Sequence, residues 1–187
     1  MTENEKRLAG EIYDPSDEEI QTIQQERIEL MDQFNSLGNS QKNFTERQEL
    51  IQKMFGRVGE NCYIESPFHA NWGGRNFYLG DNVYINFNLT LVDDVDIIVG
   101  DNVMIAPNVT ITTANHPLDP SKRRKGLQYA KKVIIENNVW LGAGVIIMPG
   151  VTIGENTIIG AGSIVTKNIP SNVVAVGNPC RVIKTIK

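Results

Sequence analysis

The feature that most limits the fold of this chain is an apolar residue at every sixth position. One series runs unbroken from Ile135 to Val165, and a smaller or β-branched residue follows four positions after each of its first five members. A period of six does not suit an amphipathic helix, whose apolar stripe recurs at 3.6 residues, and it is too regular and glycine-rich for ordinary alternating strands. It predicts short strands joined by tight corners. The two series are Ile135, Leu141, Ile147, Ile153, Ile159 and Val165, and Val139, Val145, Val151, Thr157 and Ser163.

A second period groups these strands into coils. Polar triplets recur every 18 residues, or at 18 plus an insertion, at 80–82, 100–102, 136–138 and 154–156. Three hexads therefore form one coil, and we expect a three-sided prism of stacked coils whose strands pair in parallel. Glycine, asparagine and aspartate in the triplets tolerate the positive φ that sharp corners need. The end coils leave open sheet edges, which the two termini are expected to cover.

Two interruptions of the repeat mark one corner of the prism. The spacing from Leu91 to Val99 is eight residues, and the spacing from Ile111 to Ile135 is 24, one hexad plus an insertion of 18. Both interruptions follow the same face of a coil, so they emerge one above the other. The long insertion, about residues 117–134, is predicted to be an external loop that serves function.

The sequence of the N-terminal part of the chain predicts helices. Residues 16–19 and 45–48 have the spacing of a capping box, each followed by apolar residues at helical intervals, and Gly56 suits a helix end. We expect two helices that form a lid on the first coils, with a turn at 35–43. The chain divides on this basis into a helical cap, residues 1–57, and a β-helix, residues 58–187.

Composition excludes several classes of protein. The formal charge is −4, no apolar run is long enough to cross a membrane, and the polar first ten residues do not resemble a signal peptide, so we expect a cytoplasmic protein without a membrane partner. Cys62 and Cys180 stand alone, which argues against disulfides or a cysteine zinc site. The basic run 122–125 lacks an aromatic platform or a recognition helix, so nucleic-acid binding is not expected.

The two histidines, His69 and His116, differ in the chemical roles that their positions suggest. Hexad prisms that hold zinc between subunits need three histidines, so two histidines 47 residues apart predict no metal site. His116 lies at the mouth of the long insertion. Its imidazole has an ordinary pKa near neutrality and is the candidate general base for a substrate hydroxyl.

These motifs together carry a family resemblance over nearly the whole chain. The sequence resembles the maltose and galactoside O-acetyltransferases of the hexapeptide acyltransferase superfamily, including the start of their N-terminal helical cap. Besides the hexads, the matching segments are 9–13 (AGEIY), 84–88 (YINFN), 92–94 (VDD), 106–109 (APNV), 116–117 (HP), 138–142 (NVWLG), 149–154 (PGVTIG), 165–167 (VTK) and 177–183 (GNPCRVI).

The resemblance implies a mainly β fold, a left-handed parallel β-helix, in a homotrimer with active sites between subunits. It also implies transfer of acetyl from acetyl-CoA, without a metal, to a hydroxyl, most simply the 6-hydroxyl, of a sugar or glycoside such as maltose, glucose or a galactoside. His116 would be the general base. The acceptor would contact Asn71, Tyr84, Asp94 and one of Asp14 or Asp17, between which the sequence does not choose. The coenzyme would contact Asn86, Ala143, Ala161, Thr166, Lys167, Arg181 and Lys184.

Some alternatives stay open at this point. The acceptor could instead be serine or a xenobiotic, and the prism could be a non-catalytic scaffold. Lys184 stands where the family often has arginine, which keeps the charge but not the bidentate geometry. Trp140 either lines the cleft for acyl-CoA or the acceptor, or packs against a corner. The basic run 122–125 is either a solvated loop or a positive patch that attracts the CoA phosphates. Around residues 72–76 the chain is one residue longer than the common family pattern, which affects the placement of Asn71.

Overall fold

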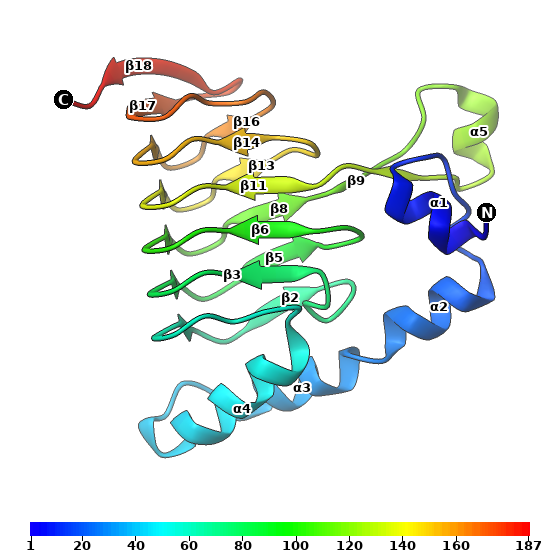
Figure 1. Cartoon of the computed structure of the whole chain (residues 1–187), viewed down its shortest axis with the longest axis horizontal. Helices are drawn as coiled ribbons and strands as arrows, with labels where there is room; N and C mark the ends of the chain where they lie inside the picture. Colours follow the sequence, from blue (N-terminus) through cyan, green and yellow to red (C-terminus); the bar gives the residue numbers. More distant parts are fainter.

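The computed structural model describes residues 1–187 and consists of a left-handed β-helix with helices at its N-terminal end (Figure 1). The β-helix has three parallel sheets, and each coil passes through them in the same order. The first sheet holds β1 (Tyr63–Ile64), β4 (Tyr84–Ile85), β7 (Met104–Ile105), β12 (Trp140–Leu141), β15 (Ile158–Ile159) and β17 (Val173–Val176), with β18 (Arg181–Thr185) at its edge. The second sheet holds β2 (Phe68–Ala70), β5 (Leu89–Val92), β8 (Thr110–Thr112), β13 (Ile146–Ile147) and β16 (Ile164–Val165). The third holds β3 (Phe77–Leu79), β6 (Ile97–Val99), β11 (Val133–Ile135) and β14 (Thr152–Ile153).

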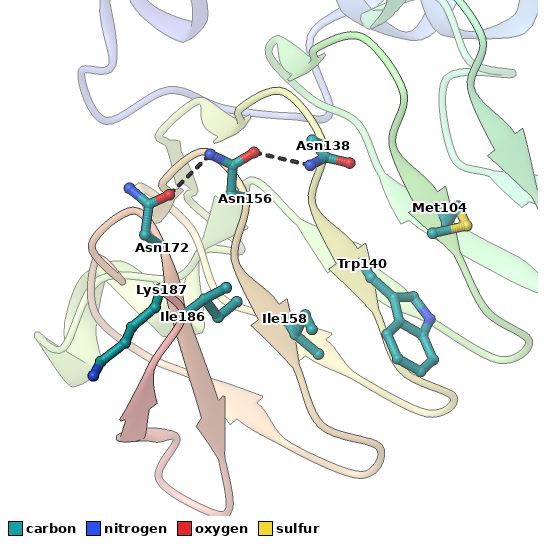
Figure 2. A pocket seen from close by; sticks show the side chains of 8 residues that line it. All are labelled: Met104, Asn138, Trp140, Asn156, Ile158, Asn172, Ile186 and Lys187. Atoms are coloured by element: carbon teal, nitrogen blue, oxygen red, sulfur yellow. Dashed lines mark hydrogen bonds between the residues drawn. The ribbon is translucent and has the colours of Figure 1, made fainter.

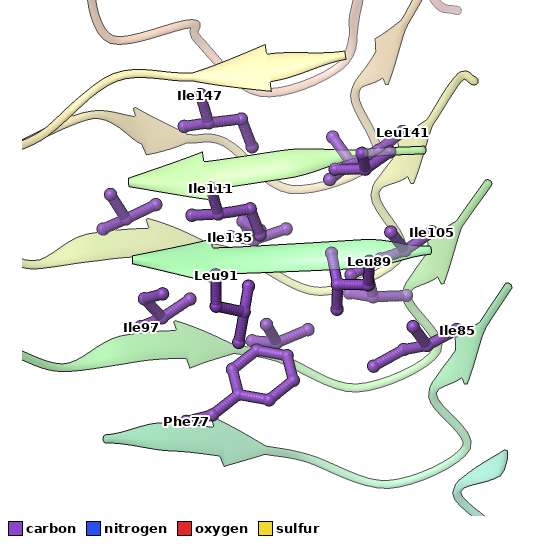
Figure 3. Close-up of a cluster of buried hydrophobic side chains, with 14 of the residues drawn as sticks. Phe77, Ile85, Leu89, Leu91, Ile97, Ile105, Ile111, Ile135, Leu141 and Ile147 are labelled. Carbon is purple, nitrogen blue, oxygen red and sulfur yellow. The ribbon is translucent and has the colours of Figure 1, made fainter. Parts of the chain in front are cut away.

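The hexad positions form the interior of the prism, as predicted. Ile135 pairs with Val99 below and Ile153 above, and Leu141 with Ile105 and Ile159, so equivalent positions stack from coil to coil. Every member of the two series is at most 2% exposed. Figure 3 shows Ile135, Leu141 and Ile147 of the first series among the apolar side chains that meet between the sheets. Burial of each isoleucine, leucine or valine stabilises the fold by about 1.5–3 kcal/mol, so the column of side chains is the main source of stability.

Asparagine and glycine have different roles at the corners of the prism. Asn82, Asn102, Asn138, Asn156 and Asn172 have φ between 56° and 60°, in the left-handed region. The glycines of the same triplets do not have positive φ, so asparagine alone adopts the left-handed conformation that the triplets were expected to tolerate. A Cβ at Gly80, Gly100 or Gly154 would overlap the next coil, and close stacking is what requires glycine there. The asparagine amides also form a ladder, in which Asn138 donates to Asn156 at 2.8 Å and Asn156 to Asn172 at 2.9 Å (Figure 2).

The N-terminal segment forms more helices than predicted. They are α1 (Glu3–Ala9), α2 (Glu18–Gln25), α3 (Ile28–Ser36), the 3₁₀ turn η1 (Gln41–Asn43) and α4 (Phe44–Met54). The expected single helix after residue 16 is broken at Arg27, whose guanidinium donates to the carbonyl oxygens of Lys53 and Met54 at the end of α4. These carbonyls have no partner within α4, so an arginine that satisfies them compensates for the break.

The caps also differ from the predicted boxes. Asp17 rather than Ser16 caps α2, and Asn43 precedes α4 without a side-chain bond, while the capping box that does form joins Thr2 and Glu5 at α1. The helices α3 and α4 pack together and cover the first coil, with Phe34 and Met54 in the core. Helix α1 lies apart from them, beside the long insertion (Figure 1). The division at residues 57 and 58 stays a prediction.

The other end of the prism is covered by the C-terminus, as expected. Strand β18 turns back and pairs antiparallel with β17, which occupies the open edge of the first sheet. The long insertion contains α5 (Pro120–Arg124) and an antiparallel pair, β9 (Ala114–Asn115) and β10 (Tyr129–Ala130). None of the helices combines the length and the apolar character needed to cross a membrane.

Candidate active site

We name the corners of the prism by the sheets they join. The first corner joins the first and second sheets (residues 86–88, 106–109, 142–145 and 160–163), and the second joins the second and third sheets (71–76, 93–96, 113–132, 148–151 and 166–168). Both interruptions of the repeat emerge at the second corner. This confirms that they lie one above the other.

Asn71 and Asp94 meet at the second corner. The amide of Asn71 donates from Nδ2 to Oδ2 of Asp94 at 3.0 Å, and its Oδ1 accepts the backbone N–H of Asp93 at 2.8 Å. Asp94 is 4% exposed in this chain. The structure thus brings two of the predicted acceptor residues together, and their role in acceptor binding stays a prediction. An amide beside a carboxylate offers the donor and acceptor groups that a hydroxyl-rich ligand needs.

His116 follows β9 at the same corner and is held by the insertion. Its Nδ1 lies 2.9 Å from the carbonyl oxygen of Leu127. A carbonyl can only accept, so Nδ1 carries the proton in the neutral ring and Nε2 has the free lone pair. The imidazole is exposed in the single chain. One nitrogen thus orients the ring and the other is available as a base.

Asp14 and Asp17 each use one carboxylate oxygen locally. Oδ1 of Asp14 accepts from the backbone N–H and the hydroxyl of Ser16 at 2.9 and 2.6 Å, which lowers the pKa of Asp14. Oδ1 of Asp17 accepts from the backbone N–H groups of Glu19 and Ile20 as the cap of α2. The second oxygen of each residue has no hydrogen bond, so both remain able to accept one. The choice between them stays open.

Asp93 is a buried carboxylate that sequence reasoning did not single out. It is fully buried and accepts the backbone N–H of Trp72 at 3.0 Å and that of Asn76 at 3.4 Å. Its loss of hydration raises its pKa to about 7, which outweighs the lowering by these N–H groups. Asp93 thereby anchors both ends of the segment that follows Asn71.

The N-terminal segment reaches the same corner through Arg7 and Tyr13. Both side chains are buried, and neither was predicted as a site residue. Arg7 stacks 4.2 Å above the ring of Trp72 and donates to the carbonyl oxygen of Asp94, while the Tyr13 hydroxyl donates to Oδ1 of Asp94 at 2.8 Å. The only sequence signal for Tyr13 is its place in the 9–13 motif, because contacts between distant segments leave no local pattern.

Other predicted site residues lie at the first corner or on the first sheet. Asn86, Ala143 and Ala161 follow β4, β12 and β15 at the first corner, with Ala143 and Ala161 at successive levels and Asn86 two levels below Ala143. The backbone N–H groups of Ala143 and Ala161 have no acceptor within the chain. Tyr84 is 39% exposed on the outer face of the first sheet and stacks on Tyr63. The structure therefore separates these residues from His116 and Asp94 by one face of the prism.

Trp140 also points outward from the first sheet. Its indole is 47% exposed and lines an open pocket of about 400 Å³ with Met104, Ile158 and the C-terminal residues Ile186 and Lys187 (Figure 2). It does not pack a corner. Figure 2 shows the asparagine ladder along one side of this pocket.

The predicted coenzyme residues near the C-terminus are all exposed. Thr166 and Lys167 follow β16 at the second corner, and Arg181 and Lys184 project from β18. In the basic run, Arg123 donates to the carbonyl oxygens of Pro117 and Leu118 at 3.1 and 2.9 Å and so holds the fold of the loop, while its neighbours are solvated. No three side chains of the metal-binding types gather at any point of the chain.

Comparison with known proteins agrees with this geometry. The family model for the bacterial transferase hexapeptide (six repeats) matches residues 132–167, and the model for the maltose acetyltransferase hexapeptide capping motif matches residues 6–59. A galactoside O-acetyltransferase of Lactococcus lactis subsp. lactis is 55% identical over 185 residues, 98% of this chain and 88% of that protein. A crystal structure of a maltose O-acetyltransferase from Clostridium difficile 630 superposes with a TM-score of 0.95 at 44% identity, over 100% of this chain and 98% of the other. A galactoside acetyltransferase in complex with coenzyme A superposes with a TM-score of 0.95 at 45% identity, over 100% and 92%.

The hexad prism and its helical cap define the chain as a hexapeptide-repeat acetyltransferase. Within that class, the identity over almost the whole of both chains shows that it belongs to the galactoside and maltose O-acetyltransferase family.

Proposed function

We propose that the chain is a cytoplasmic enzyme that transfers the acetyl group of acetyl-CoA to a hydroxyl of a sugar or glycoside, with the 6-hydroxyl as the preferred position and His116 as the general base. The observation that carries this proposal is the bond between Nδ1 of His116 and the carbonyl oxygen of Leu127, 2.9 Å long. It leaves Nε2 free to take a proton at the mouth of the insertion. A primary hydroxyl is the least hindered hydroxyl of a hexose and the simplest one to present to that nitrogen.

The acceptor site is built from the second corner. Asn71 and Asp94 supply paired donor and acceptor groups, and the free oxygen of Asp14 or Asp17 supplies a further acceptor for a hydroxyl. Neutral hydroxyls bind well to such groups because every buried polar atom then keeps a partner. A sugar satisfies more of these groups than serine or an apolar xenobiotic does.

The coenzyme site is built from the first corner, residues 166–167 of the second corner and strand β18. The exposed, small side chains of Ala143 and Ala161 let the pantetheine arm approach, and their free N–H groups are donors for its amides or for the oxyanion. Asn86 lies below them for the acyl end. The cations Lys167, Arg181 and Lys184, with the hydroxyl of Thr166, suit the phosphates. A galactoside acetyltransferase of similar structure was solved in complex with coenzyme A, which supports a coenzyme site in this chain.

The separation of the two corners supports a homotrimer with the active sites between subunits. His116 lies at the second corner, whereas Asn86, Ala143 and Ala161 lie at the first corner, so one chain does not bring the base and these three coenzyme residues together. When the second corner of one prism faces the first corner of a neighbour, His116 meets Ala143 and Ala161 of a second copy. Each prism has one corner of each kind, so such head-to-tail contacts close a ring, and a rotation of about 120° between neighbours gives a ring of three.

The chain's groups then carry out a direct transfer. Acetyl-CoA supplies the acetyl group as a thioester. Nε2 of His116 takes the hydroxyl proton as the acceptor oxygen bonds to the acetyl carbon, and backbone N–H groups stabilise the tetrahedral oxyanion. The carbon–sulfur bond breaks, and the imidazolium returns the proton to the leaving thiolate. No covalent enzyme intermediate and no metal are needed.

Thiol release from acetyl-CoA tests the proposal. The panel contains maltose, glucose, a galactoside, serine and chloramphenicol, and proton NMR of the products locates the acetyl group. We expect thiol release with sugars, and acetylation at the 6-hydroxyl. Thiol release with serine or chloramphenicol but with no sugar would show that the acceptor is not a sugar. A chain that neither binds CoA nor releases thiol would be a scaffold and not an enzyme.

A further inference from the structure

We infer that Tyr13 is a positioning residue that fixes the carboxylate of Asp94 for the acceptor and connects it to the loop that holds His116. This inference rests on the proposed function. It gives the N-terminal segment a role in acceptor binding in addition to its role in covering the β-helix.

Two contacts hold the Asp94 carboxylate in one orientation. The Tyr13 hydroxyl donates to Oδ1 at 2.8 Å, and Nδ2 of Asn71 donates to Oδ2 at 3.0 Å. Tyr13 is 1% exposed, so its hydroxyl has no access to water as an alternative partner. A carboxylate held at both oxygens loses no rotational freedom when it binds a hydroxyl, which favours affinity.

The Tyr13 hydroxyl has two possible acceptors, the carboxylate of Asp94 and the side-chain amide of Gln128. The phenol oxygen also lies 3.0 Å from Oε1 of Gln128, but a phenol has one hydrogen and cannot donate to two acceptors. The ionised carboxylate is the stronger acceptor and takes that hydrogen. A flip of the Gln128 amide, which exchanges Oε1 and Nε2, would let Nε2 donate to the phenol oxygen and so satisfy both groups.

The same two residues join the N-terminal segment to the catalytic loop. Tyr13 and Gln128 exchange backbone hydrogen bonds of 2.9 and 3.0 Å as an antiparallel bridge. The preceding carbonyl, that of Leu127, is the acceptor for Nδ1 of His116. One short ladder therefore places both the proposed base and the carboxylate of the acceptor site.

Packing is the competing explanation for Tyr13. Its ring lies in a small apolar cluster with Ile20, Trp72, Val95 and Ala130. Tyr13→Phe keeps that ring and the backbone bridge and removes only the hydroxyl, so it separates the two explanations.

Steady-state kinetics of Tyr13→Phe in the full chain test the inference. We expect the KM for the sugar to rise about tenfold, as for loss of a hydrogen bond to a charged group, while kcat and the KM for acetyl-CoA change less than about twofold. Gln128→Met is the second variant and should raise the sugar KM in the same direction by a smaller factor. Tyr129→Phe is the matched control in the same loop, because its hydroxyl has no hydrogen bond, and it should match the parent.

A double-mutant cycle with Asp94→Ala identifies the route of the effect. If Tyr13 acts through Asp94, Tyr13→Phe causes no further rise in sugar KM once Asp94 is alanine. Additive effects of the two changes, or a Tyr13→Phe chain with the parent's sugar KM, would overturn the inference and leave the proposed function intact. A parent chain that acetylates no sugar would overturn both.

Discussion

At the residue scale, the carbonyl oxygen of Leu127 decides which nitrogen of His116 carries a proton. The sequence shows a histidine at the mouth of an insertion, and the general ability of imidazole to accept a proton near neutral pH makes it a candidate base. The sequence does not show the acceptor 11 residues later that selects the tautomer. Tyr13 and Asp93 were missed for the same reason, because their partners come from segments that are distant in sequence and the repeat says nothing about them.

Asp93 gives a prediction at this scale. Its pKa in the folded chain is about 7, above its ordinary value of 3.8, so between these two values the folded chain keeps a proton that the unfolded chain has lost. The free energy of unfolding therefore falls as pH rises from about 4 to 7, by up to about 4 kcal/mol from this group.

Asp93→Asn should remove that part of the pH dependence. Unfolding measured at pH 5 and pH 8 should show a smaller loss of stability at high pH in the variant than in the parent. Asp32→Asn, which changes an exposed carboxylate, is the control and should leave the slope unchanged. An equal slope in parent and Asp93→Asn chains would contradict the burial argument.

At the element scale, the period of six predicted the strands well because one side-chain position in each strand must face the interior. The register, the three sheets and the buried series all follow from it. The helices were predicted less well because their ends depend on tertiary partners. The first predicted helix is broken at Arg27, whose side chain satisfies the end of α4, and a local capping pattern carries no information about that contact.

The asparagine ladder gives a prediction at this scale. Asn156 has φ of 60° and bonds to Asn138 and Asn172. Asn156→Gly loses the amide bonds but tolerates the backbone, and should cost about 1 kcal/mol. Asn156→Ala adds the strain of a left-handed alanine and should cost about 1–2 kcal/mol more. Denaturant unfolding measures both, and equal losses for glycine and alanine would show that φ does not limit this corner.

At the scale of the whole molecule, the sequence resemblance assigned residues to one active site that a single chain does not contain. His116, Asn71 and Asp94 occupy the second corner, whereas Asn86, Ala143 and Ala161 occupy the first. Periodicity predicts which residues share a corner of the prism, since it fixes the position of each in a coil. It does not predict how two prisms meet, because that depends on the outer surfaces of the sheets.

In the proposed reaction, His116 removes a proton next to acetyl-CoA held by a neighbouring copy. Turnover of two inactive variants, alone and co-assembled, tests it most directly. His116→Asn keeps a donor for the Leu127 carbonyl but has no basic nitrogen, and should lower kcat by about 10²–10⁴-fold. Ala161→Trp fills the coenzyme groove and should be inactive. Trimers assembled from both chains contain some intact sites and should recover turnover. Parent-like turnover by His116→Asn, or mixed trimers as inactive as each variant alone, would contradict the claim.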